Sequence, residues 1–372
     1  MRNRSLRSKR LCHPAAAHAV NILIVKLSSL GDVVHTLPAL NALRRHLPNA
    51  QISWLIEPAA RDILEGHPAL DHLLVWHRRD FETACKAGRW LTAWRVFNGV
   101  RRQLRRERYE LVIDFQGLFK SGLWVGLARG QRKAGFGRGM ERSAEGGHLF
   151  LNERVPALPM DIHALDRNLK LLEALGIPRG LVEYKFPIGK PARAKLEEQL
   201  NDWNIASTDR VAAIHPMTRW PTKLWFGDRF AAVADRLEAD GLKVVFTGGP
   251  ADQVSLDDLA SRMKSPMRRL ASEGGLKSLA ALHERARVVI STDTGPMHIA
   301  AAVGTPVVAL FGPTAPQRTG PYGDQHIVLR AGVPCSPCFS KSCRTTQVEP
   351  MACMSQITAE SVIAAVHRQL KR

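Results

Sequence analysis

The chain has 372 residues, of which 45% are hydrophobic and 23% charged. This composition is that of a globular protein and excludes an intrinsically disordered chain, and the length predicts two domains. Lysine and arginine number 53 against 34 aspartate and glutamate, a formal net charge of +19. Such a chain attracts nucleic acid, anionic membranes or phosphorylated substrates, and charge alone does not choose among them.

The chain begins with a basic segment. No acid precedes Asp32, and five cations stand in the first ten positions: Arg2, Arg4, Arg7, Lys9 and Arg10. We interpret residues 1–20 as a basic arm and not as a signal peptide, because His18 and Asn21 interrupt the apolar stretch and no cleavage site follows it. We find no uncharged apolar run of about 18 residues, so we expect no membrane span and a cytoplasmic protein.

Strand-like apolar runs alternate with helix-like periodic segments from there to the end of the chain. In the first half we predict strands at 22–26, 51–56, 73–75 and 111–114, and helices at 33–45, 88–106 and 120–128. In the second half we predict strands at 211–215, 243–247, 288–291 and 307–311, and helices at 226–239, 253–263, 276–286, 297–303 and 359–370. Repeated strand–helix–strand units with strands apolar throughout predict two doubly wound α/β domains with parallel sheets, divided near 187–191.

The loop after the first strand reads Ser28-Ser29-Leu30-Gly31-Asp32. Gly31 permits a tight turn, and the small hydroxyl side chains leave room for a ligand. Asp32 falls at the positive end of the helix dipole. Asp32 is therefore either a plain helix cap, as most aspartates at such positions are, or a functional carboxylate at the ligand-binding end of the sheet.

The basic helix at 88–106 has apolar residues at spacings of three and four. Basic amphipathic helices often lie on anionic interfaces with their aromatic side chains shallowly buried. The alternative is that the apolar face packs on the sheet, which we expect for Trp94 and Phe97. Its charge comes from arginines: Arg89, Arg95, Arg101, Arg102, Arg105, Arg106 and Arg108.

Two loops of the second half also follow strands. In HPMTRWPTKLW, Thr218 and Lys223 could meet phosphate oxygens, and we expect Trp225 to pack in the core. In TGGPAD, the paired glycines let a base or a diphosphate approach the backbone, and Asp252 could bond ribose hydroxyls. For this second loop taken alone, a plain strand-to-helix turn is the stronger interpretation.

A third loop, STDTGPMH, joins a buried strand to a helix. Its N–H groups at Thr294, Gly295 and Met297 could hold a phosphate at the helix start. Asp293 argues against a phosphate nearby, since like charges repel, and could instead cap the helix or hold a ribose or a lysine. His298 falls one turn into the helix, and the alternative for the whole loop is a capped turn with a solvated histidine.

Four of the six cysteines fall within nineteen residues near the end of the chain. Four thiolates could close a structural zinc site or hold an iron–sulfur cluster. The spacing matches no standard zinc finger, so unligated cysteines in a surface loop are the alternative. The four are Cys335, Cys338, Cys343 and Cys353.

The motif ILIVKLSSLGDVVHTLPAL at 22–40 resembles the opening of the lipopolysaccharide heptosyltransferases of glycosyltransferase family 9, and the heptosyltransferase I group most closely. The loops HPMTRWPTKLW, TGGPAD and STDTGPMHIAAAVGTPVVALFGPT match in order and spacing, so the similarity runs over 21–330. The resemblance implies a GT-B architecture, with two Rossmann-like domains facing a central cleft. It places an acceptor-binding domain at 21–187, a nucleotide-sugar domain at 188–355 that includes the cysteine loop at 335–353, and a C-terminal helix at 356–372.

The resemblance also implies an activity. It is the inverting, metal-independent transfer of heptose from ADP-L-glycero-D-manno-heptose to Kdo-lipid A, by a peripheral protein at the inner face of the cytoplasmic membrane. No cofactor and no nucleic acid take part. Met217 departs from the family pattern, as does one residue inserted before Lys223, and these leave other family 9 transfers open. A basic nucleic-acid-binding protein is the alternative from a different class.

Residue roles follow by position in the matching motifs. Asp32 resembles the family's general base, and we expect acceptor contacts from Ser29, Gly31 and His35. Asp252 stands where heptosyltransferase I has glutamate. The donor-binding set is Thr218, Lys223, Asp252, Asp293, Thr294, Gly295 and His298.

Overall fold

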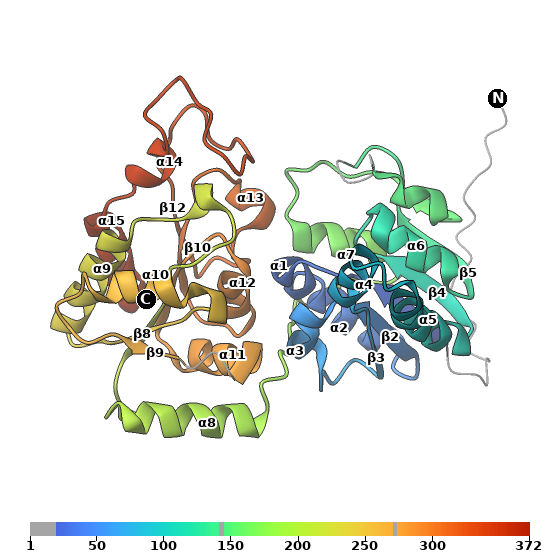
Figure 1. The fold of residues 1–372 in the computed structure, drawn as a ribbon, viewed down its shortest axis with the longest axis horizontal. Helices are drawn as coiled ribbons and strands as arrows, with labels where there is room; N and C mark the ends of the chain where they lie inside the picture. The colour runs from blue at the N-terminus through green and yellow to red at the C-terminus, as the bar shows by residue number, and fades with distance from the viewer. Residues whose placement is uncertain (1–19, 141–144, 271–273) are drawn as a thin grey trace. The chain divides into compact units, whose positions relative to one another are not determined.

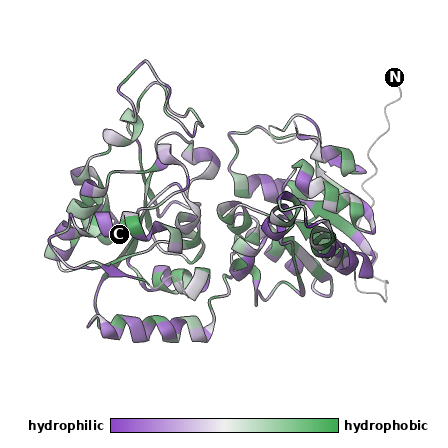
Figure 2. Ribbon diagram, viewed as in Figure 1, coloured by the Kyte–Doolittle hydropathy of each residue, from purple (hydrophilic) through white to green (hydrophobic). Residues whose placement is uncertain are grey.

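The computed structural model describes residues 20–140, 145–270 and 274–372. The predicted basic arm, apart from residue 20, lies outside this part of the chain. The chain separates into two compact units, unit 1 ending at Lys185 and unit 2 running from Phe186 to Arg372 (Figure 1). The strands at the centre of each unit are predominantly hydrophobic (Figure 2). Both units are α/β, as the sequence predicts.

Unit 1 is built on a sheet of six parallel strands in the order β3-β2-β1-β4-β5-β6. The central strand β1 is paired on both sides, with Ile22 opposite Ile52 of β2 and Leu111 of β4. The strands are β1 Asn21–Val25, β2 Gln51–Ile56, β3 His72–Val75, β4 Tyr109–Asp114, β5 Gly130–Phe136 and β6 Glu153–Val155.

The helix predicted at 33–45 is two helices in the structure. The first begins before Asp32, so Gly31 lies inside a helix and not in a tight turn, and the second begins just before Pro38, whose missing N–H suits a first turn. The helices of unit 1 are α1 Leu30–Val34, α2 Leu37–His46, α3 Arg61–Leu64, α4 Arg78–Lys86, α5 Trp90–Arg106, α6 Phe119–Leu127 and α7 Ala164–Ala174, with the 3-10 turns η1 Pro58–Ala60 and η3 Gly147–Phe150.

An aromatic cluster fixes α5 and α6 on the sheet. The ring of Trp76 lies 4.8 Å from that of Trp124 on α6, and Phe97 on α5 lies 5.1 Å from Trp124. The packing predicted for Phe97 is therefore confirmed. The same prediction for Trp94 is wrong, because 56% of Trp94 remains exposed. The buried residues of α5 are Ala93, Val100 and Leu104. Most of the first turn of this helix is therefore exposed to solvent.

Unit 2 has a second sheet of six parallel strands, in the order β12-β11-β10-β7-β8-β9. Numbered within the unit and read from the other edge, this is the 3-2-1-4-5-6 order of unit 1, the order of a doubly wound Rossmann sheet. The strands are β7 Val211–His215, β8 Lys243–Phe246, β9 Arg268–Arg269, β10 Val288–Thr292, β11 Val307–Leu310 and β12 Ile327–Leu329.

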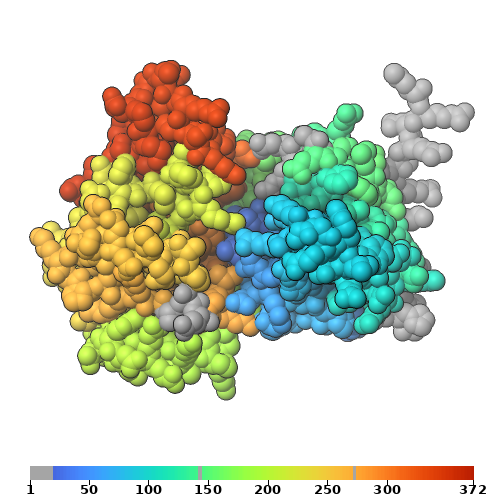
Figure 3. All heavy atoms as spheres, viewed as in Figure 1, coloured from blue at the N-terminus to red at the C-terminus, as the bar shows by residue number. Residues whose placement is uncertain are grey.

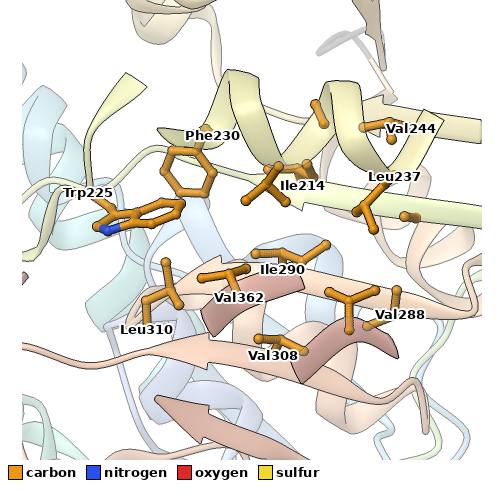
Figure 4. Close-up of a cluster of buried hydrophobic side chains, with 14 of the residues drawn as sticks. Ile214, Trp225, Phe230, Leu237, Val244, Val288, Ile290, Val308, Leu310 and Val362 are labelled. Carbon is orange, nitrogen blue, oxygen red and sulfur yellow. The ribbon is translucent and has the colours of Figure 1, made fainter. Parts of the chain in front are cut away.

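The core of unit 2 joins β7 and β10 to α9 and α15, with Ile214, Phe230 and Val362 in one apolar cluster (Figure 4). Trp225 packs edge-on against Phe230 at 4.8 Å and donates from Nε1 to the carbonyl of Ile357, which confirms its predicted place in the core. The helices are α8 Gly189–Asp202, α9 Gly227–Ala239, α10 Gln253–Ala260, α11 Gly275–Arg285, α12 Gly295–Ala302, α13 Pro316–Thr319, α14 Ala352–Ser355 and α15 Ala359–Leu370, with the 3-10 turns η4 Pro221–Lys223 and η5 Pro250–Asp252.

Candidate functional site

Each sheet has one point where its strand order reverses, between β1 and β4 in unit 1 and between β7 and β10 in unit 2. Ligands of open α/β sheets bind outside the carboxyl ends of the strands at this point. Asp32 follows β1. In unit 2, Lys223 follows β7 and Asp293 follows β10. The sequence motifs therefore converge on the two positions where the topology opens a crevice.

Asp32 sits in the first turn of α1 and closes a capping box with Ser29. The Ser29 N–H and hydroxyl both donate to Oδ2 of Asp32, at 3.2 and 3.1 Å. Its other oxygen, Oδ1, is 3.8 Å from the ammonium of Lys26, and the carboxylate side chain is 18% exposed. Asp32 is thus both a helix cap and a partly accessible anion, and the two interpretations of the sequence do not exclude each other.

Lys26, the residue directly after β1, is buried and links the two switch-point loops. Its side chain is 4% exposed, and its Nζ donates to the carbonyl of Phe115, which follows β4, at 2.9 Å. A buried ammonium beside a carboxylate favours the ionised form of that carboxylate. Sequence analysis includes Lys26 in the motif but assigns it no role. A lysine that directly continues an otherwise apolar strand is the feature that could have indicated one.

A small pocket opens beside Asp32 at the carboxyl end of the sheet. It is lined by groups from the loops after β1 and β4 and from α7, among them Lys26, Asp32, Gln116, Arg167 and Asn168. Its two cations, Lys26 and Arg167, stand beside the carboxylates of Asp32 and Asp114, while the amides can bond hydroxyl groups. The pocket can therefore hold a polar ligand that carries hydroxyl groups. Sequence analysis did not single out Arg167 or Asn168, because α7 begins 139 residues after the end of β1.

Lys120 connects this loop to the helices beside it. Its Nζ donates to the Ser28 hydroxyl at 2.9 Å and to Glu57 at 3.2 Å, and Glu57 also accepts from Arg78 at 3.1 Å. The network holds Ser28 in place through three segments of the chain. Lys120 and Arg78 are both partly exposed and share the Glu57 carboxylate.

Behind the loop, Asp114 is fully buried at the end of β4. It accepts hydrogen bonds from the N–H groups of Gln116 and Gly117 and from the Ser121 hydroxyl. Burial raises the pKa of the Asp114 carboxyl, and these hydrogen bonds together with Lys26 oppose the rise. Asp114 therefore shapes the loop between β4 and α6 and lies at the buried end of the pocket.

Two of the three predicted acceptor contacts lie inside the protein. Gly31 is buried in α1, and His35 is 3% exposed with its ring 4.9 Å from that of His163 in an edge-on contact. Both can affect a ligand only through neighbouring groups, whereas Ser29 is exposed beside Asp32.

In unit 2 an ion pair joins the two switch-point loops. Nζ of Lys223 donates to Oδ2 of Asp293 at 2.6 Å, and the Thr314 hydroxyl donates to the same oxygen at 2.6 Å. The side chains of Lys223 and Asp293 are 15% and 7% exposed. Of the roles left open for Asp293, the structure shows the one in which it holds a lysine. The ammonium also lies 4.6 Å from the ring centre of Trp220.

The start of α12 lies directly after Asp293. Thr294 is its N-cap, Gly295 its first residue, and Pro296 stands in the first turn. N–H groups in a first helical turn have no partner within the helix and point toward the ligand end of the sheet. His298 is 6% exposed, so the alternative of a solvated histidine is wrong.

The remaining donor-side residues lie around β7 and β8. Asp252 accepts from the Gly249 N–H at 2.7 Å and so braces its own loop. A Cβ at Gly248 would lie 2.8 Å from the end of the Leu256 side chain, so this loop packs closely against α10. Thr218 is half-buried in the segment between β7 and η4. Beneath them His215 contacts the Thr247 hydroxyl at 2.8 Å, and burial lowers the pKa of His215 to about 4.

The four clustered cysteines line one cavity between β12 and α14. Cys335 and Cys353 are partly buried, whereas Cys338 and Cys343 are exposed. Within the described ranges, no three His, Cys, Asp or Glu side chains are arranged so that they could hold a metal ion. Of the two alternatives for this loop, the structure therefore gives no support to the zinc or iron–sulfur site.

Comparison with known proteins agrees with this geometry. Residues 98–349 match the family described as "Glycosyltransferase family 9 (heptosyltransferase)". Lipopolysaccharide heptosyltransferase 1 of Pseudomonas aeruginosa is 32% identical over 333 residues, which is 87% of each chain. Lipopolysaccharide heptosyltransferase 3 of Escherichia coli is 28% identical over 91% of this chain and 95% of its own.

Among solved structures, the fold resembles E. coli heptosyltransferase WaaC with ADP-2-deoxy-2-fluoro heptose. The TM-score is 0.71 and the identity 26%, over 94% of this chain and 99% of that one. Searched for membrane spans, the described helices include none that is long and apolar enough to cross a bilayer.

Proposed function

Because the chain belongs to glycosyltransferase family 9, the heptosyltransferases, we propose that it catalyses the heptosyltransferase I reaction. Heptose passes from ADP-L-glycero-D-manno-heptose to Kdo-lipid A with inversion at the anomeric carbon. An acceptor oxygen forms the new bond to that carbon as the bond to the ADP oxygen breaks. The acceptor proton goes to a protein base, and ADP leaves as the anion.

Asp32 is the proposed base. Lys26, 3.8 Å from Oδ1, favours the ionised carboxylate that proton abstraction requires. Ser29 orients the carboxylate through two hydrogen bonds to Oδ2, and Asp32 lines the pocket. Arg167 and Lys120 suit an acceptor that carries phosphates and carboxylates.

The leaving diphosphate is stabilised in unit 2. Lys223 and the N–H groups at the start of α12 supply positive charge where negative charge develops. Asp293 and Thr314 orient Lys223 through two short bonds to one oxygen. Thr218 and His298 complete the donor contacts. Because a lysine and backbone dipoles supply this charge, the reaction needs no metal ion.

The adenosine end of the donor is assigned to the loop after β8. Asp252 bonds the ribose hydroxyls through the oxygen that does not hold Gly249. The enzyme works in the cytoplasm, at the inner face of the membrane where its glycolipid acceptor lies. The observation that carries the whole proposal is that each switch point holds one carboxylate–lysine pair, Lys26 with Asp32 and Lys223 with Asp293.

The test is direct. The purified chain is incubated with ADP-heptose and Kdo-lipid A, and the acceptor is examined by mass spectrometry. One added heptose per acceptor, with release of ADP, is the expected result. Unmodified acceptor in the presence of a chain that binds ADP-heptose would contradict the proposed acceptor.

A second candidate is another family 9 transfer, because relatives named heptosyltransferase 1 and heptosyltransferase 3 are both similar over most of the chain. An acceptor panel that includes heptosylated core saccharides separates the two candidates. Thermal stabilisation by ADP, UDP and an oligonucleotide addresses the third alternative. A shift with the oligonucleotide alone would indicate a nucleic-acid-binding protein.

A further inference from the structure

The first turn of α5 exposes large apolar side chains that the fold does not use. Trp90, Leu91 and Trp94 are 68%, 75% and 56% exposed. The packing of α5 on unit 1 is made mostly further along the helix, through Phe97, Val100 and Leu104, and by Ala93 in its first turns. Isolated exposed apolar residues are common, but three neighbouring ones on a single turn, two of them tryptophan, indicate an interaction surface.

This turn lies in the most basic part of unit 1. From residue 78 to residue 108 the chain has ten lysines and arginines and three acids, so most of the cations have no acid within the segment to pair with. Helical spacings of three and four place Arg101, Arg102 and Arg105 along the same side of α5 as Trp94. The segment, coloured cyan to teal, lies on the viewed face of unit 1 in Figure 3.

The topology sets the position of this turn relative to Asp32. Only two residues separate the end of α5 from β4, so α5 ends at the amino edge of the parallel sheet. Its first turn therefore lies toward the carboxyl edge, where Asp32 follows β1. On neighbouring α6, Phe119 and Leu123 are 53% and 37% exposed, on either side of the lysine that bonds Ser28.

We propose that Trp90, Leu91 and Trp94 insert into the surface of an anionic lipid bilayer, with the arginines of α5 on the lipid phosphates. Indole rings favour the headgroup depth of a membrane, and arginine stems reach along apolar surface while the guanidinium stays with phosphate. This proposal rests on the proposed function, since the docked turn brings the glycolipid headgroup to the sheet edge that holds Asp32.

Charge decides against two other occupants. A second copy of the chain in a symmetric interface would place ten cations against ten, which opposes association. A nucleic acid is anionic and its bases can stack on indole rings, but it offers no apolar surface that would bury the aliphatic side chains of Leu91 and Leu123. An acidic lipid surface matches both the apolar and the basic groups.

The test uses the full chain and vesicles of phosphatidylglycerol mixed with phosphatidylcholine, compared with phosphatidylcholine alone. We expect binding to the anionic vesicles, and an affinity at least about tenfold lower for the variant W90A/L91A/W94A. The control variant L181A/V254A removes side chains that are 76% and 81% exposed elsewhere, and should bind as the parent does. Equal vesicle binding by the triple variant and the parent would overturn the proposal.

Three further measurements separate the possible failures. The triple variant should lose transfer to Kdo-lipid A embedded in vesicles, while its transfer to the deacylated, water-soluble acceptor stays at the parent level. If neither acceptor is modified by the parent chain, the proposed function fails, and the vesicle measurement still decides the docking surface. A concentration-dependent dimer that the triple substitution abolishes, or oligonucleotide binding that it abolishes while vesicle binding is unchanged, would overturn membrane docking.

Discussion

The two units have the same strand order and a carboxylate–lysine pair at the same topological position, yet the pairs are built differently. In unit 1 Asp32 is held by long contacts, 3.8 Å to Lys26 and 3.1 to 3.2 Å to Ser29, and is 18% exposed. In unit 2 Asp293 receives two 2.6 Å bonds on one oxygen and is 7% exposed. A loosely held, accessible carboxylate can take a proton. A tightly bound carboxylate holds its lysine in position. We therefore expect the carboxylate to act on the ligand in unit 1 and the lysine to do so in unit 2.

The largest effect should come from Asp32. Replacement by asparagine keeps the shape and removes the basic oxygen, so turnover should fall roughly 10²–10⁴-fold while ADP affinity, assigned to unit 2, stays the same. Turnover with ADP-heptose and calorimetric ADP binding measure the two quantities. Asp80→Asn, which neutralises an exposed acid of the same unit, is the control. An Asp32→Asn enzyme with parental turnover would remove Asp32 as the base.

The corresponding change in unit 2 is Lys223→Met. Loss of the charge that meets the leaving diphosphate should lower kcat roughly 10²–10³-fold, and here ADP affinity should fall as well. Asp293→Asn should also lower kcat and ADP affinity, but by a smaller factor. In this variant Lys223 keeps its charge and loses only the carboxylate that positions it. Lys264→Met removes an exposed lysine of unit 2 and serves as control. An unchanged ADP affinity in Lys223→Met would contradict the division of roles between the units.

Acid should destabilise unit 2 before unit 1. Burial lowers the pKa of His215 and His326 to about 4 and that of His283 to about 3. A lowered histidine pKa means that the unfolded chain binds more protons below pH 6.5, so stability is full above that pH and is lost as pH falls toward 4. In unit 1, His67 contributes in the same direction, whereas the raised pKa of Asp114 contributes in the opposite one.

Hydrogen exchange measured peptide by peptide between pH 7 and pH 4.5 tests this difference. Unit 2 amides should lose protection first. His283→Leu removes one titrating group and should flatten the pH dependence of unit 2 alone. Loss of protection in unit 1 ahead of unit 2 would show that the histidines do not control acid stability.

The smallest expected effect is that of metal removal. If Lys223 and the start of α12 neutralise the diphosphate, a chelator should leave turnover unchanged within error. The measurement is transfer activity before and after EDTA treatment, with and without added Mg²⁺. Activity that disappears with EDTA and returns with Mg²⁺ would mean that a cation carries the charge assigned to the lysine.

Much of the architecture follows from local sequence. Strands such as β11, apolar throughout, and helices such as α15 are predicted nearly to the residue because strand and helix periods are properties of the local chain. Several elements are not predicted, among them α4, β5, β6, α7 and the 14-residue α8. Their stability comes from neighbours: α4 buries only Ala84, and β5 consists largely of glycine and charged or polar residues between β4 and β6.

The candidate site divides in the same way. Local sequence is enough to identify the residues that follow strands, including Asp32, Lys223 and Asp293, because the end of an apolar strand marks the start of its loop. The partners of these residues depend on the folded structure. Asp293 pairs with a lysine 70 residues earlier, and Lys26 reaches a carbonyl 89 residues later, because parallel strands bring distant loops to one edge. Tertiary structure also decided that Trp94 stays exposed, since helical periodicity shows which side of a helix is apolar but not how far its neighbours cover it.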